Sequence, residues 1–314
     1  MNKLITIVGP TAVGKTDLTL ALAKYYHGQV ISGDAYQVYK QLNIGTAKPT
    51  EEELDTVPHH LIDILEPNED YSVSVFQQQA KILIENLNHN SILPILSGGT
   101  GLYVQSLLEN YNFNDIKPNI ELRTELDKLY IEQGIEGLRQ RASKLAEKGG
   151  IEIRFTDKHR LYRAIELMCA GDYNALTNQT KEGLSYVGPV IGLQRERSDL
   201  YNRINRRVEI MFEKGLVDEV ISLINNGVNP DCQAFKGIGY KEVVQYLEGL
   251  ISYDACIALI QKNTRHFAKR QITWYKRMPY INWITIDSNI TEIEIYNMAR
   301  TMIDTSLYEI KDRE

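Results

Sequence analysis

Cysteine is scarce in this chain of 314 residues, and the few cysteines form no recognisable framework. Cys169, Cys232 and Cys256 are odd in number, lie far apart and include no C-x-x-C pair. This pattern excludes a disulfide-stapled scaffold and indicates reduced thiols, as in a cytoplasmic protein. The six histidines have no cysteine partners at zinc-ligand spacing, so we expect no structural zinc site.

Long hydrophobic runs are also missing. The longest apolar runs have the length of a strand, so we expect no membrane span. The first of them is interrupted by Gly9-Pro10, which is not typical of a signal peptide. With 43% hydrophobic and 24% charged residues, the composition is that of an ordinary globular protein. The length allows one large domain or two smaller ones.

A phosphate-binding pattern, G-x-x-x-x-G-K-[ST], occupies residues 9–16. The apolar, largely β-branched run 4–8 before it predicts a buried strand, and the apolar residues after it recur at helical spacing. In such a loop the backbone N–H groups face phosphates, the lysine reaches the outer phosphates and the hydroxyl can hold Mg²⁺. The alternative, a glycine-rich turn that binds nothing, does not explain this context. The predicted diphosphate or triphosphate site consists of Gly9, Pro10, Thr11, Ala12, Val13, Gly14, Lys15 and Thr16, with Mg²⁺ on Thr16.

The N-terminal third alternates strand and helix patterns. Strands are expected at 4–8, 29–34 and 92–96, a helix at 74–88, and another helix from 101 onward. Such βαβ alternation predicts a parallel sheet with helices on both faces and ligands at the carboxyl ends of the strands.

The character of the chain changes near residue 113, where helical periodicity takes over. Helices are expected near 120–132, 134–148 and 157–170, with Thr156 as the N-cap of the last. A strand at 187–193 then returns to the sheet. We therefore expect an α/β fold with a P-loop NTPase-like parallel sheet core, a mostly helical insertion domain and a helical C-terminal part. The expected ranges are 1–114 and 187–314 for the core with its basic C-terminal helices, and 115–186 for the insertion domain.

The strand-end aspartate that orders Mg²⁺ in many P-loop ATPases and GTPases has no counterpart on the third strand, which ends in Ser97-Gly98-Gly99-Thr100. The acidic residue in the best position is Asp34, at the end of the second strand. A carboxylate beside the phosphate loop can accept a proton from an incoming nucleophile. The alternative is an aspartate that only caps a turn.

One segment, 255–286, contains six lysines and arginines and no acidic residue. Its basic side chains recur every three or four residues, which brings them close to one face of a long helix. Such a face suits a polyanion such as nucleic acid, although a solvated basic helix face has the same pattern.

Together these segments resemble the bacterial tRNA dimethylallyltransferases, also called isopentenyl-diphosphate:tRNA transferases. The resemblance covers nearly the whole chain. It is carried by the phosphate loop and by the runs 32–39 (SGDAYQVY), 44–49 (IGTAKP), 58–63 (PHHLID), 98–103 (GGTGLY), 157–166 (DKHRLYRAIE), 206–216 and 237–242 (GIGYKE).

The resemblance implies a donor, dimethylallyl diphosphate, and an acceptor, N6 of the adenosine immediately 3′ of the tRNA anticodon. It implies that Asp34 is the general base, that Thr100 lies near the reacting amine, and that Arg207 contacts the diphosphate together with Lys15. Mg²⁺ is then the expected cofactor. The loop would hold the diphosphate of the donor, and no ATP turnover is expected.

The acceptor adenine must leave the anticodon loop, and residues next to the base would recognise it. The resemblance implies tRNA contacts by Asp34, Ala35, Tyr36, Gln37, Thr100, Arg123, Arg160, Arg163, Lys269 and Arg270. The partner is accordingly the anticodon stem-loop. We expect a cytoplasmic monomer without a membrane partner.

Three alternatives remain open at this stage. A small-molecule kinase would use the loop for ATP, and an adenylate isopentenyltransferase would prenylate free AMP or ADP. A nucleotide-gated RNA-binding protein would bind RNA without needing Asp34. The basic segment and the insertion favour the tRNA-modifying enzyme, because a free nucleotide needs no long basic surface.

Overall fold

The computed structural model describes residues 1–113, 116, 118–177 and 183–308. The chain divides into two compact units, Met1–Glu109 with Leu184–Glu314, and Asn110–Gly183. We call the first the core unit and the second the helical unit. No helix in the described ranges is long and apolar enough to cross a membrane.

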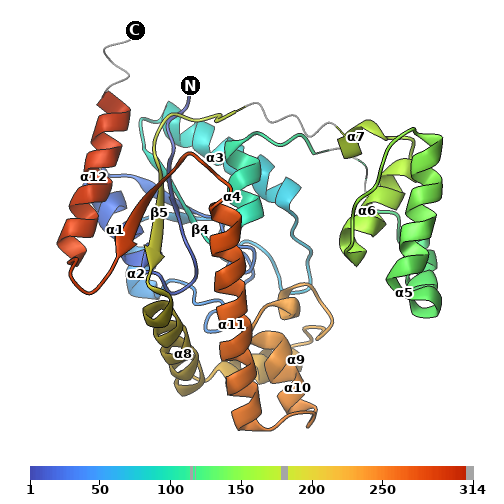
Figure 1. The fold of residues 1–314 in the computed structure, drawn as a ribbon. Coiled ribbons are helices and arrows are strands. Elements are labelled where there is room, and N and C mark those ends of the chain that lie inside the picture. Colours follow the sequence, from blue (N-terminus) through green and yellow to red (C-terminus); the bar gives the residue numbers. More distant parts are fainter. Residues whose placement is uncertain (114–115, 117, 178–182, 309–314) are drawn as a thin grey trace. The chain divides into compact units, whose positions relative to one another are not determined.

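The core unit contains the sheet and most of the helices (Figure 1). Its N-terminal elements are β1 (Ile5–Val8), α1 (Lys15–Tyr25), β2 (Gln29–Ser32), α2 (Glu51–Thr56), β3 (His59–His60), α3 (Val73–His89), β4 (Pro94–Gly98) and α4 (Gly101–Leu108). After the helical unit come β5 (Val190–Arg195), α8 (Arg197–Glu213), α9 (Leu216–Asn225), the 3₁₀ turn η1 (Ala234–Lys236), α10 (Tyr240–Leu247), α11 (Tyr253–Tyr275), β6 (Ile281–Ile286) and α12 (Glu292–Tyr308).

The sheet has six parallel strands in the order β3-β2-β4-β1-β5-β6. Strand β1 therefore lies in the interior, with Ile5 opposite Ile95 of β4 and Thr6 opposite Val190 of β5. The chain extends the sheet first on the β4 side of β1 and then on the β5 side, so the carboxyl end of β1 is a topological switch point. This confirms the predicted α/β class, and it puts the phosphate loop where ligands bind in such folds.

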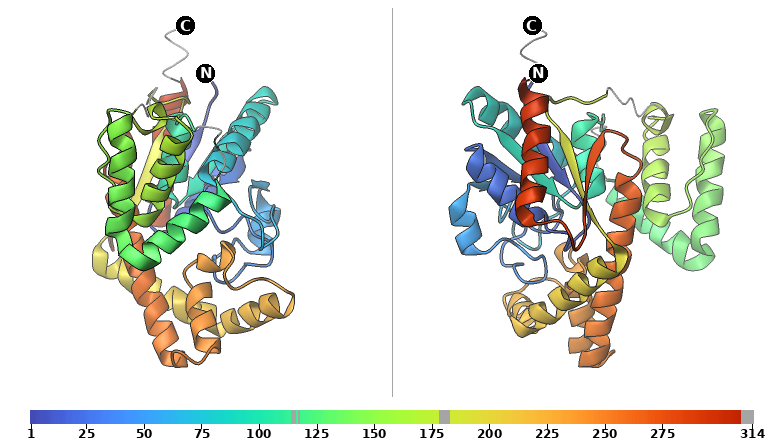
Figure 2. Two further views of the ribbon diagram at one scale, coloured as in Figure 1. Left: turned by 90° about the vertical axis from the view of Figure 1, so that its right-hand side faces the viewer. Right: turned by 60° about the vertical axis from the view of Figure 1, so that its left-hand side comes forward.

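Helices cover both faces of the sheet, which explains why β1 reads as a continuous apolar run. Ile5 and Ile7 belong to the core on one face, with α1, α8 and α12, while Leu4 and Val8 belong to the core on the other, with α3 and α4. In the right-hand view of Figure 2 the red α12 and the blue α1 lie on the near face of the sheet.

The helical unit consists of α5 (Ile120–Lys148), α6 (Lys158–Cys169) and α7 (Asn174–Thr177). Gly134 interrupts α5 with φ 63° and ψ −157°, which splits it where the sequence predicts two helices. Leu126, Leu138 and Ile165 are buried between α5 and α6. Asp157, not Thr156, is the N-cap of α6, since its carboxylate accepts a hydrogen bond from the backbone N–H of Arg160.

The chain rejoins the core unit earlier than the expected boundary at residue 187. The Ser185 backbone N–H donates to the Leu108 carbonyl at 2.9 Å, and Val187 N–H donates to Asn2. These bonds tie the segment from Leu184 onward to the core unit. The other expected boundary, between residues 114 and 115, lies outside the described residues.

Candidate active site

The phosphate loop connects the carboxyl end of β1 to the N-terminus of α1. Gly14, the N-cap of α1, has φ 108°, a left-handed conformation that favours glycine. A Cβ on Gly9, which has φ 152°, would lie 2.7 Å from the Leu193 carbonyl oxygen. These two glycines allow the loop to turn against β5 and to place backbone N–H groups at a helix N-terminus, which is suited to phosphate.

Lys15 lies in this loop with its ammonium group turned back onto the backbone. Its Nζ donates to the carbonyl oxygens of Gly9 at 2.9 Å and Pro10 at 2.8 Å. Its pKa is lowered to about 7, chiefly by burial and also by the nearby charge of Arg207, while the Asp34 carboxylate acts in the opposite direction. A bound anion would stabilise the charged ammonium form that this environment disfavours.

Arginines from β5 and α8 add to the positive charge around the loop. Arg203 donates from Nε to the Ala12 carbonyl, and Arg195 donates from Nε to the Val13 carbonyl, each at 2.9 Å. Arg207 follows Arg203 by one helical turn. Burial lowers the pKa of Arg207, and the charge of Arg203 lowers it further. Buried cations that repel one another are typical of a site for a multiply charged anion, because the bound anion would offset both the burial and the repulsion.

Asp34 follows the end of β2 and faces the same region. Its Oδ1 accepts hydrogen bonds from the backbone N–H groups of Tyr36 at 2.8 Å and Gln37 at 3.2 Å. Burial raises the pKa of Asp34 despite these bonds and the charge of Lys15. The Thr100 hydroxyl accepts from the Ala35 N–H at 3.2 Å, so the ends of β2 and β4 are joined beside the carboxylate.

A cavity of about 1070 Å³ brings these groups together within the core unit. The predicted site residues that line it are Thr11, Ala12, Gly14, Lys15, Thr16, Asp34, Gln37 and Arg207. Its apolar lining includes Leu20, Ile44, Leu54, Ile62, Ile210, Met211 and Phe267. One cavity thus offers cations, a carboxylate of raised pKa and room for a small apolar group.

Sequence reasoning missed three side chains that hold the loop in place. Gln271 of α11 is buried; its Oε1 accepts from Thr11 N–H at 2.9 Å, and its Nε2 donates to the Gly99 carbonyl at 2.8 Å. Arg195 and Arg203 are the other two. A signal existed for Arg203, which lies four residues before Arg207 on one helix face. Gln271 is a neutral residue within the basic segment 255–286, and no pattern in the sequence around it indicates a contact with the phosphate loop.

Of the residues expected to recognise the adenine, Gln37 and Tyr36 already have contacts within the protein. The Gln37 side-chain oxygen accepts from the Ser32 hydroxyl at 3.0 Å, and its amide nitrogen donates to the carbonyls of Thr46 and Ala47 at 3.4 and 3.3 Å. Both ends of this amide are therefore engaged within the protein, although Gln37 lines the cavity. Tyr36 is partly buried and packs against the core.

Two of the arginines expected to contact tRNA are paired with a buried carboxylate in the helical unit. Glu166, with 1% of its side chain exposed, accepts from Arg123 Nε at 2.7 Å and from Arg163 at 3.4 Å. Arg160 is exposed and pairs with Asp157 at 3.3 Å. The structure thus pairs Arg123 and Arg163 with Glu166 inside this unit, and a tRNA contact by these two arginines stays a prediction.

Lys269 and Arg270 lie exposed on α11, as the basic pattern predicts. Together with His266, Thr273, Trp274 and Arg277 they line a second, shallow recess of about 510 Å³. Basic groups around an aromatic ring suit the phosphates and bases of single-stranded nucleic acid.

The residues present fit a Mg²⁺ ion that is held mainly by its substrate. Thr16 is exposed to the cavity at the start of α1. Among the described residues no group of three or more histidine, cysteine or acidic side chains is arranged to hold a metal. Magnesium commonly keeps several waters and binds through few protein ligands together with phosphate oxygens, which matches the Thr16 hydroxyl beside a phosphate loop.

The model of the IPP transferase family matches residues 37–278 of this chain. The chain belongs to the IPP transferase family. It is 42% identical to the tRNA dimethylallyltransferase of Clostridioides difficile, over 93% of this chain and 94% of that protein. It is also 42% identical to the enzyme of that name from Halalkalibacterium halodurans, over 93% of this chain and 95% of that protein.

Solved structures of the family agree with this assignment. The tRNA isopentenylpyrophosphate transferase of Bacillus halodurans is 40% identical, with a TM-score of 0.72 over 98% of each chain. A eukaryotic dimethylallyltransferase acting on tRNA has a TM-score of 0.79 at 24% identity, over 100% of this chain and 81% of that one, and shows the shared fold. The predicted resemblance is therefore confirmed.

Proposed function

We propose that this protein transfers the dimethylallyl group of dimethylallyl diphosphate to N6 of the adenosine immediately 3′ of the anticodon in tRNA, releasing diphosphate. The observation that carries this proposal is the single cavity in which the cations around the phosphate loop face the carboxyl group of Asp34. Relatives that match almost the full length of the chain are named for the same reaction.

The bonds, electron pair and proton of this reaction balance with Asp34 as the proton acceptor. The bond between C1 of the allyl group and the diphosphate oxygen breaks, and its electron pair leaves with the diphosphate. A new bond forms between C1 and N6 of the adenine, and N6 loses one proton. Asp34 accepts that proton, because its Oδ1 is held by two backbone N–H groups while the carboxylate lines the cavity.

Negative charge grows on the leaving diphosphate in the transition state, so cations at that end lower the barrier. Lys15 and Arg207, with the backbone N–H groups of the phosphate loop, would bind it. Mg²⁺, when bound at Thr16, would neutralise part of the diphosphate charge. The apolar side chains of the cavity, among them Ile62 and Met211, would surround the five-carbon chain. Thr100 adjoins the base through Ala35 N–H.

The tRNA anticodon stem-loop is the proposed macromolecular partner. Exposed Lys269 and Arg270 on α11 would contact its phosphates. Tyr36 and Gln37 would border the inserted adenine, Gln37 as a wall residue whose amide is held by the loop 46–47. Arg160 remains a candidate phosphate contact on the helical unit. We further propose that the protein acts as a monomer in the cytoplasm, where its three unpaired cysteines stay reduced.

The test is transfer of label from radioactive dimethylallyl diphosphate, with Mg²⁺, to an unmodified tRNA with adenosine at the target position. The control tRNA carries guanosine there, and AMP is a parallel acceptor. Label only on the adenosine tRNA is the expected result. Label on AMP would instead assign the free-nucleotide reaction, and phosphoryl transfer from ATP without prenylation would assign a kinase.

A further inference from the structure

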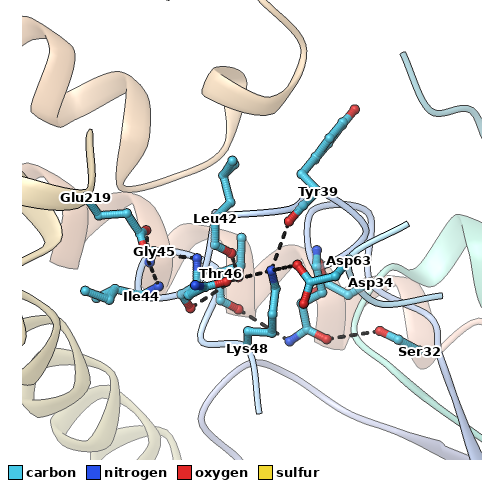
Figure 3. Close-up of polar contacts among 12 residues, drawn as sticks. Ser32, Asp34, Tyr39, Leu42, Ile44, Gly45, Thr46, Lys48, Asp63 and Glu219 are labelled. Carbon is cyan, nitrogen blue, oxygen red and sulfur yellow. Dashed lines mark hydrogen bonds and ion pairs between the residues drawn. The ribbon is translucent and has the colours of Figure 1, made fainter. Parts of the chain in front are cut away.

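A carboxylate from a different part of the chain anchors the loop that forms one wall of the cavity. Glu219 of α9 accepts at Oε2 from the backbone N–H groups of Asn43 at 3.0 Å and Ile44 at 2.8 Å, and at Oε1 from Gly45 N–H at 3.2 Å (Figure 3). Successive N–H groups that converge on one point form a concave anion site in many proteins. Here the anion is supplied by the protein itself.

Two further contacts fix this anchor. The Tyr240 hydroxyl donates to Glu219 Oε1 at 2.6 Å, and the Tyr240 ring is buried in the core. A Cβ on Gly45 would lie 2.4 Å from that ring, so the loop backbone passes directly over it. The carboxylate therefore has a fixed position, and the loop is held against α9 and α10 at residues 43–45.

Residues 43–45 are linked by hydrogen bonds to residues 46–48, so that the loop 43–48 behaves as one rigid body. Lys48 is almost fully buried, with 4% of its side chain exposed; its Nζ donates to the Tyr39 carbonyl at 2.9 Å and to Asn43 Oδ1 at 2.8 Å, and it pairs with Asp63 at 2.5 Å. The Thr46 hydroxyl donates to the Leu42 carbonyl at 2.6 Å (Figure 3). A displacement at residues 43–45 would therefore move the whole loop.

This body is connected to the proposed general base by hydrogen bonds. The carbonyls of Thr46 and Ala47 accept from the Gln37 side-chain amide. The Gln37 backbone N–H is in turn one of the two donors to Asp34 Oδ1. These bonds couple the position of the loop to that of Gln37, which the Ser32 hydroxyl also holds, and Gln37 N–H helps to orient the carboxylate.

We propose that Glu219 is a positioning residue for the transfer reaction. It touches neither the phosphate loop nor Asp34, and it acts by holding the 43–48 wall so that Gln37 and Asp34 face the acceptor base. The expected effect of Glu219 on the transfer rate rests on the proposed function. The anchoring itself is a property of the folded protein.

The decisive variant is Glu219→Gln, because its side-chain nitrogen cannot accept a hydrogen bond from the backbone N–H groups or the tyrosine hydroxyl. We expect the single-turnover rate of transfer to fall about tenfold or more, as expected when misplaced loop residues no longer support proton transfer. The affinity for pyrophosphate should stay within about twofold, since no phosphate-loop contact is lost. Amide exchange of residues 43–45 should accelerate.

Tyr240→Phe removes one of the four hydrogen bonds and should change the transfer rate and the amide exchange in the same direction, but less. The matched control is Asp218→Asn, which removes the same charge from the adjacent, exposed position of α9. It should leave transfer, pyrophosphate affinity and exchange unchanged.

The inference is overturned if Glu219→Gln leaves transfer and exchange at wild-type levels. It is also overturned if transfer and pyrophosphate affinity fall together in proportion to a loss of folded protein in thermal unfolding. A wild-type protein that labels no tRNA would refute the proposed function instead. The exchange measurement needs no substrate and would still decide whether Glu219 holds the loop.

Discussion

At the scale of single residues, the phosphate loop contains a lysine whose charge is disfavoured until an anion binds. Lys15 has a pKa of about 7, well below the ordinary 10.5, because burial and Arg207 both oppose its charge. Between these two values the folded protein binds fewer protons than the unfolded chain, so this group makes stability rise with pH in that range. Binding of an anion should reverse the shift.

We therefore predict that pyrophosphate binding at pH 8 takes up a proton through Lys15. Calorimetry in buffers of different ionisation enthalpy measures this uptake. Lys15→Arg keeps a positive charge that does not titrate, so the uptake due to the protein should disappear. Equal proton uptake in the wild type and in this variant would show that Lys15 is already protonated in the free protein.

Asp34 is expected to set the acid side of the pH profile. Burial raises its pKa, so the ionised base is lost as the pH falls through a value above the ordinary 3.8. The transfer rate should decline with it, and Asp34→Asn should slow transfer by about 10²–10⁴-fold, the usual contribution of a general base. Single-turnover rates and filter binding of tRNA measure the two effects separately.

The amide of Asp34→Asn can still accept from Tyr36 N–H and Gln37 N–H, so the turn after β2 is preserved. tRNA affinity should accordingly change little. Near-normal turnover in this variant, with an unaltered pH profile, would remove Asp34 as the base.

At the scale of elements, α11 serves two purposes on its two faces. Gln271 and Tyr275 are buried and donate to the Gly99 and Gly98 carbonyls at the end of β4. Lys269 and Arg270 point outward from the same turns. The charges in the sequence predicted the outer face. The role of the inner face depends on the neutral amide of Gln271, whose partners Thr11 and Gly99 are distant in sequence and are brought to it only by the fold.

Replacement of the inward amide should weaken the phosphate site. Gln271→Leu leaves Thr11 N–H and the Gly99 carbonyl without their partner, and each buried unsatisfied group costs about 1–3 kcal/mol. We expect roughly tenfold weaker pyrophosphate binding together with a lower unfolding temperature. The matched control is Gln261→Leu on the same helix, which loses only a bond to the Asn205 carbonyl and should keep its affinity.

The outward charges should govern the salt dependence of tRNA binding. Neutralising Lys269 and Arg270 together should reduce the slope of log affinity against log salt by about 1.4–1.8, since each phosphate contact contributes about 0.7–0.9. Exposed Lys3 and Lys24, near β1 and in α1, form the control pair. If both pairs leave the slope unchanged, the basic face of α11 is a solvated surface and not a tRNA contact.

At the scale of the whole molecule, the chain forms two units with separate hydrophobic cores. Burial alone would raise the pKa of Glu166, but the hydrogen bonds from Arg123, Asn119 N–H and Arg163 lower it. This carboxylate therefore stabilises the helical unit at neutral pH, and the contribution is lost as the pH falls below the ordinary 4.5 through the lowered value.

Glu166→Gln should destabilise the helical unit by up to about 3 kcal/mol, because it leaves two cations beside a buried neutral group. Amide exchange should accelerate in α5 and α6 and stay unchanged in β1 and β4. Glu152→Gln is the control, since its partner Arg154 is exposed and such pairs contribute little. Equal acceleration in both units would show that they unfold together.

The sequence by itself determined the phosphate loop, the parallel α/β core and the family, because each depends on local patterns: glycines at fixed spacing, β-branched runs and a helical period. Only the tertiary structure decided which side chains hold that loop. Gln271 lies 260 residues from Thr11 along the chain, and Glu219 lies 174 residues from Gly45. A hydrogen bond forms wherever donor and acceptor meet at about 3 Å, and residue type alone does not show that meeting. The ion pair of Arg123 with Glu166 shows the same limit, since the two residues lie on different helices and only the fold brings them within 2.7 Å.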